Sequence, residues 1–299
     1  MTVLTIFSAP KPFTDPHIAI IQRNAIGSWM RLPEAEVFLV GDEPGLAEAA
    51  LEFGVQHLPD VARNPEGTPL VSSIFSLARQ ASSAPLLVYV NADILLTPDL
   101  VDSARKVVSM ARKFLIVGQR WDLDVTQPLD FSGDWAVSLK DEAHAHGELH
   151  RPMGSDYFIF PRDCFADMPE FAIGRAGWDN WMIYKSRKEG WATVDATSSI
   201  MIIHQNHDYS HLPGGQPHYK LPETYENIRL AGGREVTRFT LLDTNRKLVD
   251  GRLRCPGWSG ERFIRWLEAF PLLMFDNYWL ASRIAYVVRR IRIKLGLEK

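Results

Sequence analysis

The first 120 residues alternate between strand and helix patterns, and this alternation limits the chain to few architectures. Leu86–Val90 is a continuous apolar run, too short for a helix and typical of a central parallel strand that is buried on both faces. A βαβ succession of this kind, joined by right-handed crossovers, predicts an α/β fold with an open, mostly parallel, doubly wound sheet. The other expected strands are 3–8, 36–40, 55–58 and 114–117, and the expected helices are 18–30, 46–53, 69–81 and 98–113.

The second part of the chain is less regular. Residues 121–153 lose periodicity and become polar. We expect a long loop or lid over the edge of the sheet at which ligands would bind, because loops of this length in compact domains are usually functional or disordered. The elements expected after it are strands at 157–160 and 193–203, a helix at 178–189, an irregular segment at 210–260 and two helical pieces at 261–295, broken near Pro271.

Charge is unevenly distributed along the chain. The 36 acidic and 33 basic residues give a net charge of -3, but residues 283–299 hold six basic residues against Glu298. This basic tail therefore carries +5 and residues 1–282 carry -8. Such an acidic body argues against a nucleic-acid partner bound across the whole surface, because that binding needs Lys and Arg to displace counterions from phosphates. A local phosphate site is compatible with it.

Cysteine usage and hydropathy indicate a cytoplasmic protein. Cys164 and Cys255 lie in dissimilar contexts without zinc-type spacing, so we expect both to be reduced. The N-terminus lacks the basic and apolar regions of a signal peptide and is typical of a first strand. Near the C-terminus, the uncharged stretches 269–275 and 277–282 are shorter than the roughly 20 residues that cross a bilayer. We therefore expect no spanning helix.

Polar residues directly after strands are the candidates for a site, because ligands of open α/β sheets bind beyond the carboxyl ends of the strands. Asn91-Ala92-Asp93 follows the most apolar strand. A carboxylate there can hold a hard divalent cation, which neutralises a diphosphate leaving group. Asn and Asp are also ordinary turn residues at strand ends, so the tripeptide alone leaves both interpretations open.

Two further groups contain side chains that could ligate a metal or act as a base. The histidines of the segment 204–211 follow another expected strand, where imidazoles can ligate a metal or merely cap a turn. Asp179 lies between Trp178 and Trp181 at an expected helix start. Aromatic planes stack on sugar rings and a carboxylate there can act as a base, although a helix-capping Asp with two core tryptophans gives the same pattern.

Taken together and in this order, these features resemble the metal-dependent glycosyltransferases of the GT-A fold, in the nucleotide-diphospho-sugar transferase superfamily. The resemblance spans residues 1–211 and implies a nucleotide-binding half at 1–120 and an acceptor and metal half at 121–211. A C-terminal extension with a basic amphipathic helix would follow at 212–299. The residues that carry the resemblance are Phe7-Ser8-Ala9-Pro10-Lys11, Tyr89-Val90-Asn91-Ala92-Asp93, Gly177-Trp178-Asp179 and His204.

The resemblance implies specific roles. The family's tripeptide is Asp-x-Asp, the DXD motif, whose last carboxylate ligates Mn²⁺ or Mg²⁺. Asp93 would thus be the metal ligand and Asn91, which replaces the usual first Asp, a ribose contact. His204 would complete the metal shell, with His207 as second choice. Asp179 falls where related enzymes with a Gly-Trp-Gly-x-Glu-Asp motif carry the acceptor-binding base, which implies an inverting reaction.

The first loop and one further carboxylate fit the same resemblance. Ser8, Pro10 and Lys11 would border the base and phosphates of the nucleotide, although an exposed loop lysine is an equal alternative for Lys11. Asp156, just before an expected strand, would bind hydroxyls of the donor sugar or compete with Asp179 as the base.

These observations predict an enzyme that moves a sugar from a nucleotide-diphosphate sugar to a hydroxyl of a glycan or glycolipid acceptor. A nucleotidyltransferase that makes such a donor is one alternative, but it normally carries a Gly-rich basic phosphate loop, which Ala9-Pro10-Lys11-Pro12 is not. A non-catalytic carbohydrate-binding module is the other, and it would keep the tryptophans without a metal.

The basic tail has two interpretations. Its apolar residues between Leu280 and Leu295 recur at helical spacing, with arginines beside or opposite them. Such a helix can lie on the anionic inner face of a membrane as a peripheral anchor, aided by Trp266, Tyr278 and Trp279. It can equally pack on the body and leave a basic face in solvent.

Overall fold

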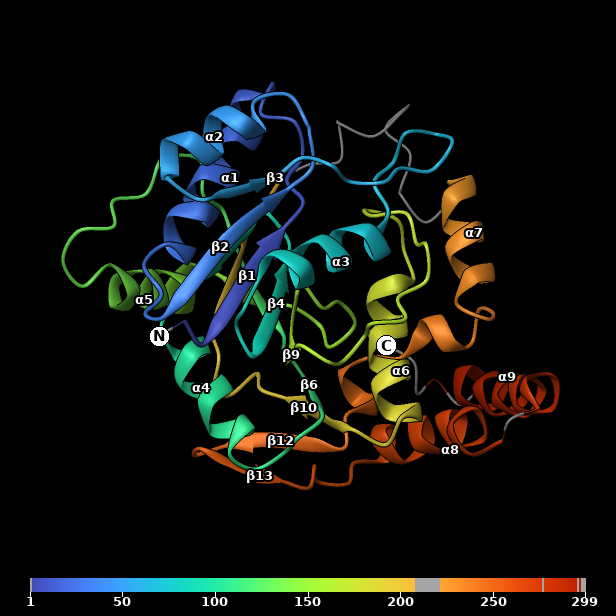
Figure 1. The fold of residues 1–299 in the computed structure, drawn as a ribbon. Coiled ribbons are helices and arrows are strands. Elements are labelled where there is room, and N and C mark those ends of the chain that lie inside the picture. Colours follow the sequence, from blue (N-terminus) through green and yellow to red (C-terminus); the bar gives the residue numbers. More distant parts are fainter. Residues whose placement is uncertain (1, 208–220, 276, 295, 297–299) are drawn as a thin grey trace.

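The computed structural model describes residues 2–207, 221–275, 277–294 and 296 (Figure 1). Within these residues the strands form two sheets. The larger contains β1 (Leu4–Ser8), β2 (Ala35–Val40), β3 (Gln56–Leu58), β4 (Leu86–Val90), β6 (Phe114–Val117), β9 (Tyr157–Pro161), β10 (Ala192–Asp195), β12 (Arg246–Val249) and β13 (Arg252–Arg254). The smaller contains β5 (Ile94–Leu96), β7 (Arg120–Leu123), β8 (Glu148–Leu149) and β11 (Ile202–Gln205).

Helices flank the larger sheet. Those of the described residues are α1 (Pro16–Trp29), α2 (Leu46–Phe53), α3 (Val71–Ala81), α4 (Asp99–Val108), α5 (Trp135–His146), α6 (Trp178–Lys188), α7 (Pro222–Leu230), α8 (Gly260–Met274) and α9 (Tyr278–Lys294), with short 3-10 turns η3 (Val236–Arg238) and η4 (Leu241–Asp243).

The larger sheet has the order β13-β12-β10-β6-β9-β4-β1-β2-β3 and is mostly parallel, as predicted. The strand β9 runs antiparallel between β4 and β6. Its direction follows from the chain path, because β7, α5 and β8 keep the chain at the carboxyl edge after β6, and the next strand must start from that edge. The second exception is β13, which forms an antiparallel hairpin with β12.

The core lies on both faces of this sheet. Every residue of β4 is buried, and its side chains alternate between two hydrophobic clusters. Tyr89 belongs to the cluster under α3 and α6, together with Phe75 and Trp178. Val88 belongs to the cluster under α1 and α4, together with Trp29. Helices on both faces confirm the doubly wound architecture that the alternation predicted.

Several elements differ from the sequence-based expectation. Residues 121–153 are not a plain loop, because they contain most of β7 together with α5 and β8. The helix α5 was hard to recognise since only Leu139 and Ala143 are buried in it. Within the described part of 210–260, the chain forms α7, two 3-10 turns and the β12–β13 hairpin. Pro271 lies inside α8 and does not end the helix, which continues to Met274. The turn after Pro271 is still hydrogen-bonded, since Phe275 N–H donates to the Pro271 carbonyl at 3.0 Å. The break between the two helical pieces therefore comes after Met274.

The C-terminal helices are attached through a buried ion network. The Arg265 guanidinium of α8 contacts both carboxylate oxygens of Asp243 at 2.9 and 3.0 Å and Glu268 at 2.7 Å. Arg292 of α9 reaches the second Glu268 oxygen at 3.3 Å. Burial raises the pKa of Glu268, and the positive charges of Arg265 and Arg292 oppose that rise.

Both cysteines are free, as expected, with Cys164 buried and Cys255 exposed.

Replacing Arg265 by alanine is expected to destabilise the protein by about 3–5 kcal/mol, because it leaves Asp243 and Glu268 buried without their main counter-charge. Urea unfolding followed by circular dichroism measures this change. Arg229→Ala is the matched control, since the Arg229–Glu226 pair lies on the exposed surface of α7, and its unfolding midpoint should not move. Equal midpoints for Arg265→Ala and the parent would contradict the importance of the network.

Candidate active site

The candidate site begins where β4 ends. Asn91-Ala92-Asp93 connects β4 to β5, and β5 pairs antiparallel with β11 so that Ile94 lies opposite His204. The Asp93 carbonyl accepts hydrogen bonds from the Gln205 backbone at 3.1 Å and from its side-chain amide at 3.3 Å. This pairing brings Asp93 beside His204, although 110 residues separate them in the sequence.

Asp93, His204 and His207 form a cluster that could hold a metal ion, with one ligand atom of each residue within 4.8 Å of the others. His207 Nε2 lies 3.1 Å and His204 Nε2 lies 3.8 Å from Asp93 Oδ2. The other oxygen, Asp93 Oδ1, is buried and has no hydrogen-bond partner among the described residues. A carboxylate with two imidazoles is a donor set that suits divalent ions such as Mn²⁺, so these residues fit the metal expected from the sequence.

Neighbouring positive charge keeps Asp93 ionised. Burial by itself would raise its pKa, but the hydrogen bond from His207 and the charges of His204 and Lys11 outweigh burial and hold the pKa well below its usual range. Burial in turn lowers the pKa of Lys11, and the Asp93 carboxylate opposes that effect. The Lys11 side chain is therefore not the freely exposed loop lysine of the alternative interpretation.

Asp122 lies beside His204. The strand β7 pairs parallel with β11 and places Asp122 opposite His204, with Asp122 Oδ1 3.2 Å from His204 Nδ1. Its second oxygen lies 2.7 Å from His150 Nδ1, and Arg120 Nε donates to Oδ1 at 2.8 Å. This is an ion-pair contact, since His204 Nδ1 has no hydrogen-bond partner among the described residues. In metal sites, a carboxylate that hydrogen-bonds a ligating histidine fixes which ring nitrogen faces the metal. The sequence analysis did not identify Asp122 and Arg120. Their spacing of two residues, which is typical of one face of a strand, was the available signal, but they lie in a segment that was expected to be a loop.

Asn91 belongs to a second hydrogen-bond chain. The Tyr89 hydroxyl donates to Asn91 Oδ1 at 3.1 Å, and the Asn91 amide donates to Asp156 Oδ1 at 2.8 Å. Arg120 donates to the other Asp156 oxygen at 2.9 Å, so both oxygens of Asp156 are engaged. An aspartate at position 91 would face the Asp156 carboxylate without a hydrogen to donate, so the asparagine amide fits this position.

Asp179 lies at the start of α6, directly after Gly177 and Trp178. Gly177 has a φ of 108°, a conformation that favours glycine and turns the chain into the helix. Burial raises the pKa of Asp179 to about 6, backbone hydrogen bonds oppose the rise, and the negative charge of Asp156 adds to it. A carboxylate with such a pKa can accept a proton near neutral pH.

Tyr89 shows that the carboxylates converge. Burial raises its pKa, and the charges of Asp93, Asp156 and Asp179 raise it further. Three acidic groups that are distant from one another in the sequence therefore lie near enough to act on one phenol. The nearby tryptophans are core residues, since Trp178 packs edge-on against Tyr89 with ring centroids 5.0 Å apart and is 5% exposed. This favours the core interpretation of the tryptophans over sugar stacking.

The first loop is tied to α1. Gln22, which sequence reasoning missed, accepts from the Lys11 backbone N–H at 2.6 Å and donates to the Lys11 carbonyl at 2.9 Å. Ser8 ends β1 with a buried hydroxyl that has no hydrogen-bond partner among the described residues, and Pro10 is buried beside it. The last residues of the histidine-rich segment, 208–211, and the expected domain boundary at 211–212 lie outside the described residues.

No helix in the described residues is both long and apolar enough to span a bilayer. No protein-family model and no curated protein sequence matches the chain. Solved structures do match it. Glucosyl-3-phosphoglycerate synthase from Mycobacterium tuberculosis, with Mn²⁺, UDP-glucose and phosphoglyceric acid, is 14% identical over 78% of this chain and 80% of that chain, with a TM-score of 0.48. The mannosyltransferase PcManGT from Pyrobaculum calidifontis, with GDP-Man and Mn²⁺, is 14% identical over 97% and 75%, with a TM-score of 0.46.

TarS from S. aureus, in complex with UDP-GlcNAc, is similar over nearly the whole chain. It is 10% identical over 95% of this chain and 79% of that chain, with a TM-score of 0.51. At this identity the likeness establishes the architecture. Together with the mostly parallel sheet and its flanking helices, it shows that the chain has the GT-A fold of glycosyltransferases.

Proposed function

We propose that the protein is a divalent-metal-dependent glycosyltransferase that moves a sugar from a nucleotide-diphosphate sugar to an acceptor hydroxyl. The observation that carries this proposal is the cluster of Asp93, His204 and His207 at the carboxyl end of β4, within a GT-A fold. The nucleotide sugar held by the similar structure of TarS, UDP-GlcNAc, supports it. A binding module without metal chemistry would have no need for this cluster.

Asp93, His204 and His207 would hold the metal, and Asp122, 3.2 Å from His204 Nδ1, would position His204 from behind. When bound there, a divalent ion neutralises the charge of a nucleoside diphosphate leaving group. Lys11, close to Asp93, adds a second positive charge for the phosphates. Ser8, Pro10 and Asn91 are the proposed contacts to the nucleoside.

Asp179 is the proposed base. Both oxygens of Asp156 are held by side chains, those of Asn91 and Arg120, whereas Asp179 accepts from backbone N–H groups, including that of Gly177 at 3.3 Å. Asp179 takes the proton of the acceptor hydroxyl as its oxygen attacks the anomeric carbon and the bond to the diphosphate breaks. One displacement of this kind inverts the anomeric centre. Asp156 is assigned to positioning and to hydroxyls of the donor sugar.

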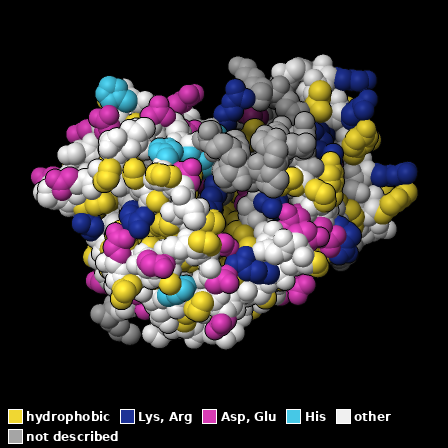
Figure 2. Space-filling view, turned by 90° about the horizontal axis from the view of Figure 1, so that it is seen from above, with side chains coloured by type: hydrophobic (Ala, Val, Ile, Leu, Met, Phe, Trp, Pro, Cys, Tyr) yellow, Lys and Arg dark blue, Asp and Glu magenta, His cyan; other side chains and the backbone are white. Residues whose placement is uncertain are grey.

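Helices α8 and α9 form an exposed surface that we propose lies on an anionic membrane, where a glycolipid acceptor would be reached. The inner face of α9 packs through Ala281 and Ala285, both 0% exposed, while Trp279, Val287 and Ile291 are 62%, 55% and 52% exposed. On the side where Figure 1 places α7, α8 and α9, hydrophobic and basic side chains protrude next to one another (Figure 2). Apolar side chains interspersed with arginines are the composition that binds anionic lipid surfaces.

Metal binding tests the core of the proposal. Asp93→Asn should weaken Mn²⁺ binding by more than about 100-fold, because even residues behind a metal ligand contribute about 10–100-fold. Asp122→Asn should fall within that smaller range. Isothermal titration with Mn²⁺ in the presence of UDP or GDP measures both. Asp124→Asn, an exposed carboxylate two residues from Asp122, is the control and should bind like the parent. Tight, metal-dependent nucleotide binding by Asp93→Asn would refute the site.

The base assignment predicts a pH profile. The pKa of Asp179 is raised to about 6, so the ionised base is lost below that pH, and kcat/KM should fall about tenfold per pH unit there and level off above it. Asp179→Asn should lower kcat by about 10²–10⁴-fold with little change in Mn²⁺ affinity. Transfer from UDP- or GDP-sugars, followed by release of the nucleoside diphosphate, measures both. If Asp156→Asn abolished the acid limb and Asp179→Asn kept it, the two roles would be exchanged.

Membrane attachment is tested by co-sedimentation with vesicles. The full chain should pellet with phosphatidylcholine vesicles that contain phosphatidylglycerol and stay in solution with phosphatidylcholine alone. The triple change Trp279→Ser, Val287→Ser and Ile291→Ser should release it, because it removes the apolar contact and leaves every arginine in place. Tyr225→Ser on α7, which is 56% exposed, is the control. Unchanged sedimentation of the triple variant, or no sedimentation of the parent, would contradict the attachment.

A further inference from the structure

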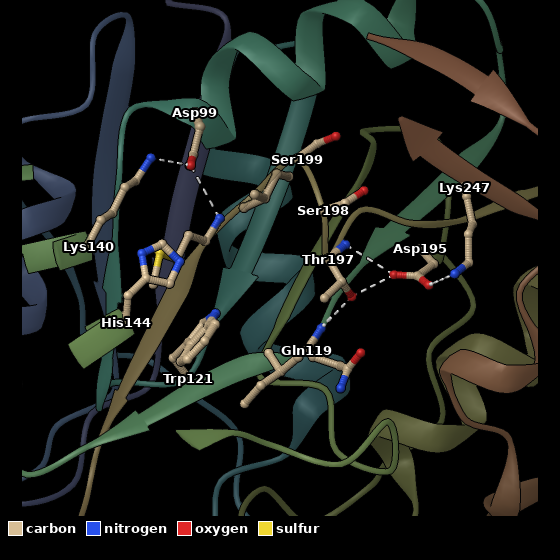
Figure 3. Close-up of a pocket in the computed structure, with 13 residues that line it drawn as sticks. Asp99, Gln119, Trp121, Lys140, His144, Asp195, Thr197, Ser198, Ser199 and Lys247 are labelled. Carbon is tan, nitrogen blue, oxygen red and sulfur yellow. Dashed lines mark hydrogen bonds and ion pairs between the residues drawn. The ribbon is translucent and has the colours of Figure 1, made fainter. Parts of the chain in front are cut away.

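A second cavity, of about 550 Å³, lies away from the metal cluster. Its position follows from strand alternation. Asp122 and His204 face each other on the side of the smaller sheet toward Asp93, so the preceding residues, Trp121 and Ile203, face the other side. Trp121 lines the cavity, together with residues of α5 and of the connection between β10 and β11 (Figure 3). The cavity is within the about 300–1,000 Å³ of small-molecule sites.

The charged residues of this cavity compensate one another. On one wall, Lys140 donates to Asp99 at 2.6 Å, and on the opposite wall Lys247 lies 3.6 Å from Asp195 (Figure 3). Two carboxylates and two ammonium groups leave no net formal charge on these four residues. The lining therefore offers many hydrogen-bond donors and acceptors without favouring an anion such as phosphate or a metal cation.

One aromatic side chain completes the lining. Trp121 is half-buried, and its ring packs edge-on against His144, with centroids 5.0 Å apart. An indole beside hydrogen-bonding groups is the combination that holds a sugar ring, whose C–H face packs on the aromatic plane while its hydroxyls bond to polar groups.

A buried hydroxyl near the cavity also lacks a partner. The Tyr157 hydroxyl has no hydrogen-bond partner among the described residues. It lies against Gly118 and close to the backbone of Thr197, which lines the cavity. Its pKa is raised by burial and by the charges of Asp195 and Asp99. Unsatisfied buried polar groups are rare in folded proteins, so this hydroxyl, behind the lining residues, marks unused hydrogen-bonding capacity next to the cavity.

We propose that this cavity is a binding site for a neutral saccharide, separate from the donor site. Trp121 provides the stacking face, and the Asp99–Lys140 and Asp195–Lys247 pairs bind the hydroxyls. The proposal rests on the cavity and not on the transferase activity, so it stands or fails independently of the Asp93 cluster.

Saturation-transfer NMR without metal or nucleotide tests the proposal. The probes are glucose, mannose and N-acetylglucosamine with their disaccharides maltose, mannobiose and chitobiose. At least one disaccharide should bind, and Trp121→Ala should weaken it at least about tenfold, because the stacking face is lost. Lys247→Ala, at a residue whose side chain is 44% exposed, should weaken it several-fold while leaving the thermal unfolding midpoint unchanged. Trp258→Ala, at a tryptophan outside the cavity that is 69% exposed, is the control and should bind like the parent.

The outcomes separate this site from the donor site. Trp121→Ala should keep the Mn²⁺-dependent nucleotide binding of the parent, and Asp93→Asn should keep saccharide binding. No signal from any of the six probes would overturn the proposal, as would tighter binding of glucose 6-phosphate than of glucose. If Trp121→Ala does not fold, Lys247→Ala decides, and an unchanged affinity in that variant would also overturn it.

Discussion

The candidate site depends on one carboxylate that is largely buried and still ionised. Asp93 lies at the end of a fully buried strand, where desolvation alone would favour its neutral form. Its charge is maintained by two imidazoles and one ammonium group, which come from β11, from the residues after it and from the first loop. Those three segments must therefore be in place before the site exists. The fold serves this requirement, since β5 pairs with β11 and Gln22 holds the first loop.

The carboxylates around Asp93 are also held by neighbouring donors. Arg120 contacts Asp122 and Asp156 at once, and so connects the carboxylate behind His204 with the carboxylate beside Asn91. Asp93, Asp122 and Asp156 thereby have basic or side-chain amide partners, whereas Asp179 accepts from backbone N–H groups and its pKa is raised to about 6. The contrast between one carboxylate with a raised pKa and others held by donors is the usual arrangement of groups that divide acid–base and binding roles. Asn91 fits this arrangement, because its amide supplies a hydrogen that a carboxylate would lack.

Much of the fold and part of the site could be predicted from the sequence. The apolar run of β4 and the alternation around it predicted the doubly wound sheet, and strand ends led to Asp93 and His204. The antiparallel β9 was not predictable, because a buried strand has the same composition in either direction. Asp122 and Arg120 were hidden in a segment interpreted as a loop, where four residues of β7 give too short a pattern. Gln22 and Tyr89 act through contacts between distant segments, which no local pattern encodes.

The strand β7 has a consequence for how this protein can change. Consecutive side chains of a strand point to opposite faces, so Trp121 lines one cavity and Asp122 contacts His204 of the candidate metal-binding cluster. A single inserted residue before this strand would exchange the two faces, and would place a carboxylate where the indole lies and an indole behind His204. One insertion outside the cavity and the cluster would therefore disrupt both of them. The register of the four residues of β7 is thus constrained by both of its faces. Insertions or deletions in the connection between β6 and β7 should be tolerated far less than substitutions there.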